Sequence, residues 1–178
     1  TADLEAGYGD TPQDVGETMA AALGIGVVGC NLEDQQRPVE EAARRVEAAR
    51  ARADREGVPM VINARLDMPF DSTSDVEEAA RRARAYLDAG ADCVFPIRAR
   101  GGDLLRRLVE RVDAPLNAFG VPGGLSVGGL EQLGVARVSF GPGPLGTALA
   151  ALHRAGTDLL GGGRIDDDLG FRPPDPAG

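Results

Sequence analysis

The stretch GVVGCNLEDQQRPVEEAARRVEAARARADREGVPMVINARLD, residues 26–67, decides the fold. An apolar run ending in acidic residues is followed by a helical run, with Ala and Val on one stripe and Arg and Glu opposite. A second apolar run then ends in Arg65 and Asp67. Mostly apolar runs are typical of parallel strands covered on both faces, and the amphipathic run predicts a helix between them. The stretch is therefore a βαβ unit.

The same alternation continues along the whole chain. We expect six strands, at residues 2–5, 27–33, 60–65, 93–97, 116–119 and 137–140, and a last helix over about 144–160. Six βα units predict an α/β protein with a parallel sheet. Two architectures fit, a doubly wound sheet and a TIM-type (β/α)8 barrel of which about six units are present. No G-x-G-x-x-G motif follows the first strand, which weakens a dinucleotide-binding fold.

Domain limits and helix starts follow from local composition. We expect one barrel domain over residues 1–160 and a flexible tail over 161–178, which is rich in Gly, Asp and Pro. Thr11 with Pro12 is a predicted helix start. A second start is predicted from Thr73 or Ser74 as the N-cap, with Glu77 completing a capping box.

Composition excludes several classes of function. The net charge of −9 argues against nucleic-acid binding. The chain contains no Lys, so a Schiff-base aldolase and a P-loop are excluded. The single His153 lies in a helical pattern, which makes a His-centred triad implausible. The cysteines Cys30 and Cys93 lie in apolar runs, as buried thiols in a reducing compartment do, and we expect a cytoplasmic protein without a membrane span.

Carboxylates gather where the predicted strands end. Asp3 and Glu5 are two residues apart, so they point to the same side of an ideal strand, and Glu33 ends the next strand. Three converging carboxylates repel one another unless a cation lies among them, and oxygen ligands alone favour Mg²⁺ or Mn²⁺. Asp34 and Asp67 have a plainer interpretation as helix caps or solvated charges.

Arg65, at the end of the third predicted strand, suits a bidentate contact with a carboxylate or phosphonate. A metal beside an arginine fits a small 2-oxo acid, whose enolate the metal stabilises when a bond next to the carbonyl breaks. Asn117 and Tyr8 are further candidates for substrate binding. The alternatives are that Arg65 only pairs with Asp67 and that Tyr8 only packs in a loop.

Ordered motifs identify a resemblance. The segments TADLEAGYGD, GVVGCNLEDQ, VINARLD, RARAYLDAGADCVFPI, PLNAFGVPG and LGVARVSFGPGPLGTALAAL resemble the isocitrate lyase/phosphoenolpyruvate mutase superfamily, in family order and over residues 2–160. The resemblance implies a (β/α)8 barrel, with ADLEAGYGD as its third strand. It also implies that two βα units precede the chain, so we expect an N-terminally truncated sequence.

The resemblance also implies roles for particular residues. The family's metal-binding acidic pair matches Asp3 and Glu5, with Glu5 where many members have Asp. The glutamate of the family's ED motif matches Glu33, and the substrate-binding arginine matches Arg65. The implied activity is Mg²⁺-dependent cleavage or rearrangement of a C–C or P–C bond through an enolate, with Glu33 and Arg65 as the catalytic residues.

Two departures from the family pattern limit the choice of reaction. The stretch EDQQRPVEEAAR lacks the Lys, Cys and His of the gating loop of isocitrate and methylisocitrate lyases, so their general acid is missing. NAFG stands where methylisocitrate-lyase-like members have TEFG, which leaves Ala118 in place of the glutamate. Alternatives therefore stay open: a non-catalytic relative that binds small carboxylates, an inactive fragment of such a barrel, or another α/β fold.

The last helix predicts self-association. Leucines cover much of its surface, at positions 145, 149, 152, 159 and 160. Because members of the resembling family exchange their C-terminal helices, the resemblance implies a homo-oligomer, a dimer or a tetramer.

Overall fold

The fold is known from a computed structural model that describes residues 1–72 and 74–170. The chain divides into two compact units, Thr1–Ser139 and a second that begins at Phe140. Each unit is described by itself.

The first unit alternates strand and helix throughout. Its elements, in order, are β1 (Ala2–Asp3), α1 (Pro12–Gly24), β2 (Gly29–Glu33), α2 (Val39–Arg55), β3 (Val61–Leu66), α3 (Asp75–Asp88), β4 (Cys93–Pro96), α4 (Gly102–Val112), β5 (Asn117–Phe119), α5 (Val127–Gln132) and β6 (Arg137–Ser139). All six predicted strands are present. β3 has the predicted length but lies one residue later, and the other five are shorter than predicted.

The strands are parallel and neighbours in chain order. β1, β2, β3 and β4 form one sheet in that order, and β5 pairs with β6. A parallel bridge between Val94 and Leu116 links β4 to β5. Consecutive parallel pairing confirms the partial-barrel prediction, because a doubly wound sheet reverses its strand order.

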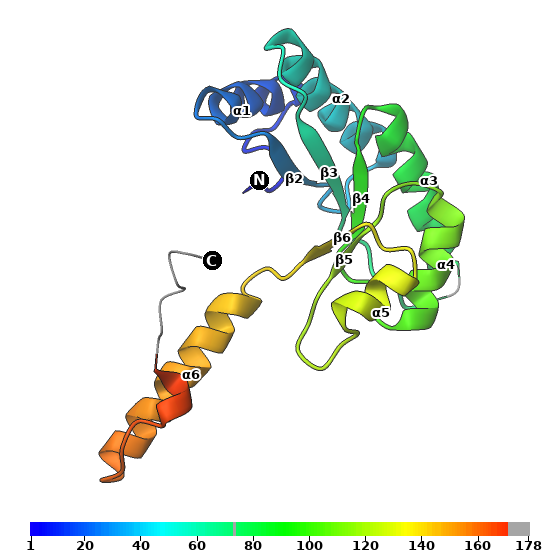
Figure 1. The fold of residues 1–178 in the computed structure, drawn as a ribbon. Helices are drawn as coiled ribbons and strands as arrows, with labels where there is room; N and C mark the ends of the chain where they lie inside the picture. Colours follow the sequence, from blue (N-terminus) through cyan, green and yellow to red (C-terminus); the bar gives the residue numbers. More distant parts are fainter. Residues whose placement is uncertain (73, 171–178) are drawn as a thin grey trace, which may run out of the picture. The chain divides into compact units, whose positions relative to one another are not determined.

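Alternation along the strands separates a packed face from a polar face. Cys30, Leu32, Ile62, Ala64 and Leu66 belong to the core that the strands share with the helices. Helices α1 to α4 follow one another along this side of the strands (Figure 1), and neighbouring helices pack together. The strand residues that alternate with these core residues point to the opposite face. They include Asn31, Glu33, Asn63 and Arg65. The functional candidates on β2 and β3 therefore share one face.

Both predicted helix starts are found, but only the first has the predicted capping box. Thr11 caps α1 with a capping box, since its hydroxyl accepts from the Asp14 N–H and the Asp14 carboxylate accepts from the Thr11 N–H. At α3 the N-cap Ser74 makes no side-chain capping bond. Instead the Asp75 carboxylate accepts from the Ser72 N–H at 2.6 Å. Thr73, the alternative cap, lies outside the described residues.

The second unit contains α6 (Gly143–Leu160) and the short 3-10 helix η1 (Asp167–Leu169). α6 begins one residue before the predicted start. It has no buried residue, and its leucines 145, 149, 152, 159 and 160 are all at least half exposed. Of the predicted tail, residues 161–170 are described and 171–178 lie outside the description. Among the described residues, every helix is too short or too polar to cross a membrane.

Candidate functional site

Arg65 is held between two carboxylates on neighbouring strands. Its register partner on β2 is Glu33, and one guanidinium nitrogen of Arg65 donates to the Glu33 carboxylate. The Nε of Arg65 donates to Asp67 Oδ1 at 2.7 Å. The Arg65 side chain keeps 19% of its surface exposed. The pairing with Asp67 considered as an alternative is present, since Arg65 Nη2 also lies 2.7 Å from Asp67 Oδ1. The two carboxylates together orient the guanidinium.

Excess negative charge surrounds Glu33. Burial raises the pKa of its carboxyl group above the ordinary value, and the guanidinium of Arg65 opposes that shift. Three further carboxylates raise it again through space, those of Asp67, Asp3 and Glu5. Four carboxylates thus act on one another beside a single guanidinium, and this imbalance suits a divalent cation.

The predicted metal ligands come from two neighbouring strands but are not gathered at one point. Asp3 and Glu5 are exposed, and Asp3 Oδ1 accepts from the Glu5 N–H at 3.2 Å. The Glu33 N–H donates to the Glu5 carbonyl at 2.7 Å, so the two strand ends are joined directly. Within residues 1–72 and 74–170 no group of three His, Cys, Asp or Glu side chains is arranged to hold an ion. The donor types and the charge fit Mg²⁺, and the ligand set Asp3, Glu5 and Glu33 stays a prediction.

A buried arginine on α2 holds the loop that follows β1. Arg45 is 2% exposed and donates to three carbonyl oxygens of this loop, on Ala6 at 3.1 Å, Gly9 at 2.9 Å and Asp10 at 2.5 Å. Thr18 of α1 adds a hydrogen bond from its hydroxyl to the Gly7 carbonyl at 2.8 Å. The loop that carries Glu5 is therefore fixed from two helices.

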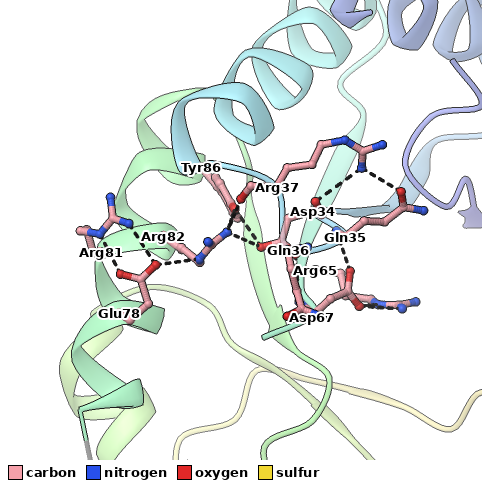
Figure 2. Close-up of polar contacts among 10 residues, drawn as sticks. All are labelled: Asp34, Gln35, Gln36, Arg37, Arg65, Asp67, Glu78, Arg81, Arg82 and Tyr86. Carbon is pink, nitrogen blue, oxygen red and sulfur yellow. Dashed lines mark hydrogen bonds and ion pairs between the residues drawn. The ribbon is translucent and has the colours of Figure 1, made fainter. Parts of the chain in front are cut away.

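A buried carboxylate holds the loop that follows β2 (Figure 2). Asp34 is 3% exposed, and its Oδ1 accepts from the backbone N–H groups of Gln36 and Asp67, at 2.9 and 3.0 Å. Its Oδ2 accepts from the Tyr86 hydroxyl at 2.9 Å and from Arg82 at 3.0 Å. The interpretation of Asp34 as a cap or a solvated charge is wrong, because all its acceptor sites are used inside the protein.

Asp67 completes the same network. It is 6% exposed and is not a solvated charge either. Its Oδ2 accepts from the Gln35 N–H at 2.9 Å, while its Oδ1 accepts from Arg65. Gln35 and Gln36 have φ angles of 47° and 57°, a left-handed conformation that side chains other than glycine rarely adopt. Two buried aspartates thus fix a tight turn in the stretch where the resemblance implies a gating loop.

Tyr8 and Asn117 are the remaining predicted substrate contacts. Tyr8 is 64% exposed, so the loop-packing interpretation is wrong, and it lines a depression of about 490 Å³ together with Glu5, Gln35 and Arg37. Asn117 is fully buried on β5, where its side-chain N–H donates to the Ser139 hydroxyl at 2.8 Å. Its Oδ1 has no partner among the described residues. The binding roles of Tyr8 and Asn117 stay predictions.

Sequence reasoning missed the residues that support the site. Arg45 follows Ala42 by three residues and precedes Ala49 by four, which places it on the apolar stripe of α2. Tyr86 continues the buried series Ala79 and Ala83 on α3. A charge or a hydroxyl on a buried stripe needs a partner inside the protein, and that signal could have identified both.

Comparisons with known proteins agree with these observations. The family model described as phosphoenolpyruvate phosphomutase matches residues 1–160. An uncharacterised protein of Mycobacterium tuberculosis H37Rv is 36% identical over 162 residues, which cover 86% of this chain and 58% of the relative. The 2-methylisocitrate lyase of Halalkalibacterium halodurans is 29% identical over 169 residues, 85% of this chain and 54% of the relative. The chain therefore spans somewhat more than half of the length of these two relatives.

Solved structures show the same architecture. A Burkholderia cenocepacia protein inferred to be a phosphonomutase has 40% identity and a TM-score of 0.80, over 87% of this chain and 67% of that one. A 2,3-dimethylmalate lyase has 27% identity and a TM-score of 0.79, over 97% of this chain and 61% of that one. An oxaloacetate acetylhydrolase has 28% identity and a TM-score of 0.78, over 98% and 63%.

The family match covers residues 1–160, and it agrees with the consecutive parallel strands and with the acidic strand ends around Arg65. This chain therefore belongs to the phosphoenolpyruvate phosphomutase family, within the phosphoenolpyruvate mutase/isocitrate lyase superfamily of barrel enzymes.

Proposed function

We propose that the protein is a divalent-metal-dependent lyase or mutase that acts on a small 2-oxo acid or dicarboxylate through an enolate. The observation that carries the proposal is the Arg65 guanidinium, which lies between Glu33 and Asp67 at the acidic ends of β2 and β3. A guanidinium held in a fixed orientation is suited to recognise a carboxylate or a phosphonate. The excess of carboxylates beside it suits the metal that such chemistry needs.

Each residue has a defined part in this proposal. Asp3, Glu5 and Glu33 would hold Mg²⁺, or Mn²⁺, which would supply the positive charge that stabilises an enolate. Arg65 binds and orients the substrate carboxylate. Glu33 is also proposed as a catalytic carboxylate beside Arg65. Tyr8 and Asn117 are further proposed contacts of the substrate.

Activity can be tested with the substrates named for related proteins. The protein, in its longest natural form and with Mg²⁺, is incubated with oxaloacetate, 2,3-dimethylmalate, 2-methylisocitrate and phosphoenolpyruvate, and products are followed by NMR. We expect turnover of at least one, and a fall in kcat/KM of about 100-fold or more for Arg65→Ala. The matched control is Arg106→Ala, because the Arg106 side chain is 53% exposed and pairs with Asp103 on the surface of α4.

Metal binding is tested separately by thermal stability. Mg²⁺ at 100 times its dissociation constant should stabilise the wild type by about 2.7 kcal/mol. Glu33→Gln should lose most of that response, whereas Glu77→Gln on the exposed surface of α3 should keep it. Binding of a small carboxylate without turnover would favour the non-catalytic relative, and an absent Mg²⁺ response in the wild type would contradict the metal site.

Two broader features belong to the same proposal. The leucines exposed on α6 support a homo-oligomer, a dimer or tetramer that covers this helix. A monomer in sedimentation at high concentration would contradict that assembly. A cytoplasmic location is supported by the two free, buried thiols of Cys30 and Cys93.

A further inference from the structure

The loop after β1 has an unusual backbone. Glu5, Gly7 and Tyr8 have φ angles of 47°, 92° and 50°, so three of four successive residues are in the left-handed region. Only glycine adopts this region readily, and Glu5 and Tyr8 do so only if their surroundings hold them there. The conformation of this loop is therefore imposed by contacts outside it.

Arg45 supplies those contacts. Its guanidinium lies beneath the loop and collects the carbonyls of Ala6, Gly9 and Asp10, which turn inward to meet it. Its nearest carboxylate, Glu41, lies 3.8 Å from Nε on the same helix, and Nε has no hydrogen-bond partner among the described residues. A buried guanidinium that is satisfied mainly by carbonyls stabilises the particular loop conformation that presents them.

The loop that Arg45 shapes carries one proposed metal ligand and adjoins the other two. Glu5 opens it, and the Glu5 carbonyl accepts from the Glu33 N–H. Asp3, two residues earlier, accepts from the Glu5 N–H. A change in the loop backbone therefore moves the carboxylate of Glu5 and both connections to its neighbours.

We propose that Arg45 is the positioning residue of the acidic site: it fixes the backbone of residues 6–10, so that the Glu5 backbone keeps its hydrogen bonds with Asp3 and Glu33. The inference rests on the proposed function for the metal, but it concerns a residue buried in the helix layer that touches neither metal nor substrate. Loss of Arg45 should weaken cation binding far more than loss of an equally well bonded arginine elsewhere.

α2 provides that matched control five residues further on. Arg50 donates to the carbonyls of Gly90 at 3.0 Å and Met60 at 2.8 Å, and to the Asp92 carboxylate at 2.6 Å. Met60 and Gly90 precede β3 and β4, so Arg50 binds backbone at the end of the strands opposite the acidic site. The two arginines share helix, residue type and number of hydrogen bonds, and they hold different loops. Arg50 also pairs with a carboxylate and keeps 21% of its side chain exposed, against 3% for Arg45.

The test compares Mg²⁺ titrations, by calorimetry and by the Mg²⁺-dependent rise in melting temperature, for the wild type, Arg45→Met and Arg50→Met. Both variants should melt at lower temperature than the wild type. Arg45→Met should raise the dissociation constant for Mg²⁺ about 10- to 100-fold, as expected for supporting residues of a metal site, and Arg50→Met should leave it within about twofold. Arg45→Lys, which keeps a charge but not the fork of donors, should fall between wild type and Arg45→Met, and serves if Arg45→Met does not fold.

Amide hydrogen exchange without metal supplies the second measurement. Exchange at residues 6–10 should accelerate in Arg45→Met and stay unchanged in Arg50→Met. The proposal would be overturned if all variants bound Mg²⁺ with the affinity of the wild type. It would also be overturned if Arg45→Met and Arg50→Met lost Mg²⁺ affinity equally. A wild type that ignores Mg²⁺ would overturn the proposed metal site and this role with it, and the exchange data would still report whether Arg45 orders the loop.

Discussion

The loops after β1 and β2 lie side by side and are held by buried charges of opposite sign. After β1 the guanidinium of Arg45 collects three backbone carbonyls. After β2 the carboxylate of Asp34 collects two backbone N–H groups, a tyrosine hydroxyl and an arginine. Both loops contain non-glycine residues in the left-handed region. In both loops, the charge of the buried side chain is opposite to the partial charge of the backbone groups that the turn brings inward: a cation for carbonyl oxygens, an anion for N–H groups.

The two loops differ in the charged groups that they present at the strand ends. The loop after β1 turns its carbonyls inward and exposes Glu5 and Tyr8. The loop after β2 is joined through Asp67 to Arg65, so the same network that fixes the turn also orients the proposed substrate-binding guanidinium. The first loop presents carboxylates, and the second anchors a cation.

Removal of the carboxylate at the centre of the second loop should have the largest effect on stability. Asp34→Ala leaves the Tyr86 hydroxyl and two backbone N–H groups without this acceptor. It also removes the carboxylate that pairs with the largely buried Arg82. We expect unfolding in urea to show a loss of about 3–5 kcal/mol. Asp103→Ala is the control, because that side chain is 99% exposed, and should change stability by less than about 0.5 kcal/mol. A loss below about 1 kcal/mol for Asp34→Ala would show that the turn does not depend on the carboxylate.

Alkaline pH should lower stability next most strongly, and it sets the range in which the loops can be compared. Burial raises the pKa of Cys30 to about 12 and of Cys93 to about 11, from 9.0. Above pH 9 the unfolded chain releases these protons and the folded chain retains them, so stability falls as pH rises. The loss at pH 10 relative to pH 7 should be about 1.4 kcal/mol for each thiol.

The control for this pH dependence is Cys30→Ala with Cys93→Ala, which should remove most of the fall between pH 7 and 10. An unchanged profile in that double variant would assign the fall to other groups. The loop variants are therefore best compared below pH 9, where the thiols are protonated in both states.

Loss of a single hydroxyl should weaken the second loop by a smaller amount. Tyr86→Phe removes one donor to Asp34 Oδ2 and leaves Arg82 in place. We expect a loss of about 1.5 kcal/mol, typical of one hydrogen bond to a charged group. Tyr8→Phe, which changes an exposed ring in the first loop, should be close to neutral in the same urea titration. Similar losses for the two tyrosines would contradict the assignment of Tyr86 to the network.

The smallest effect is expected where the first loop enters α1. Thr11→Ala removes the hydroxyl that accepts from the Asp14 N–H and should cost about 1 kcal/mol in thermal or urea unfolding. Gln13→Ala, at an exposed position in the same turn, is the control. A loss for Thr11→Ala that matches Arg45→Met would indicate that the helix cap, and not the buried arginine, orders the loop.

The sequence by itself determined the order and type of the elements. Residues 26–67 predict a strand, a helix and a strand, and the structure has β2, α2 and β3 there. Apolar periodicity reflects local burial, which repeats within a few residues and can be read without knowledge of distant partners. The same holds for the position of Glu33 and Arg65 at strand ends, and for the cap at Thr11.

Only the tertiary structure decided how those strand ends are held. Asp34 meets Arg82 and Tyr86 from 48 and 52 residues further along the chain, and Arg45 meets carbonyls 35 to 39 residues before it. A sequence shows that a charge lies on a buried helical stripe, but it does not show which backbone groups a strained turn brings inward. The partner of a buried charge depends on that turn, since the cost of burial is offset only when donors and acceptors meet in the folded chain.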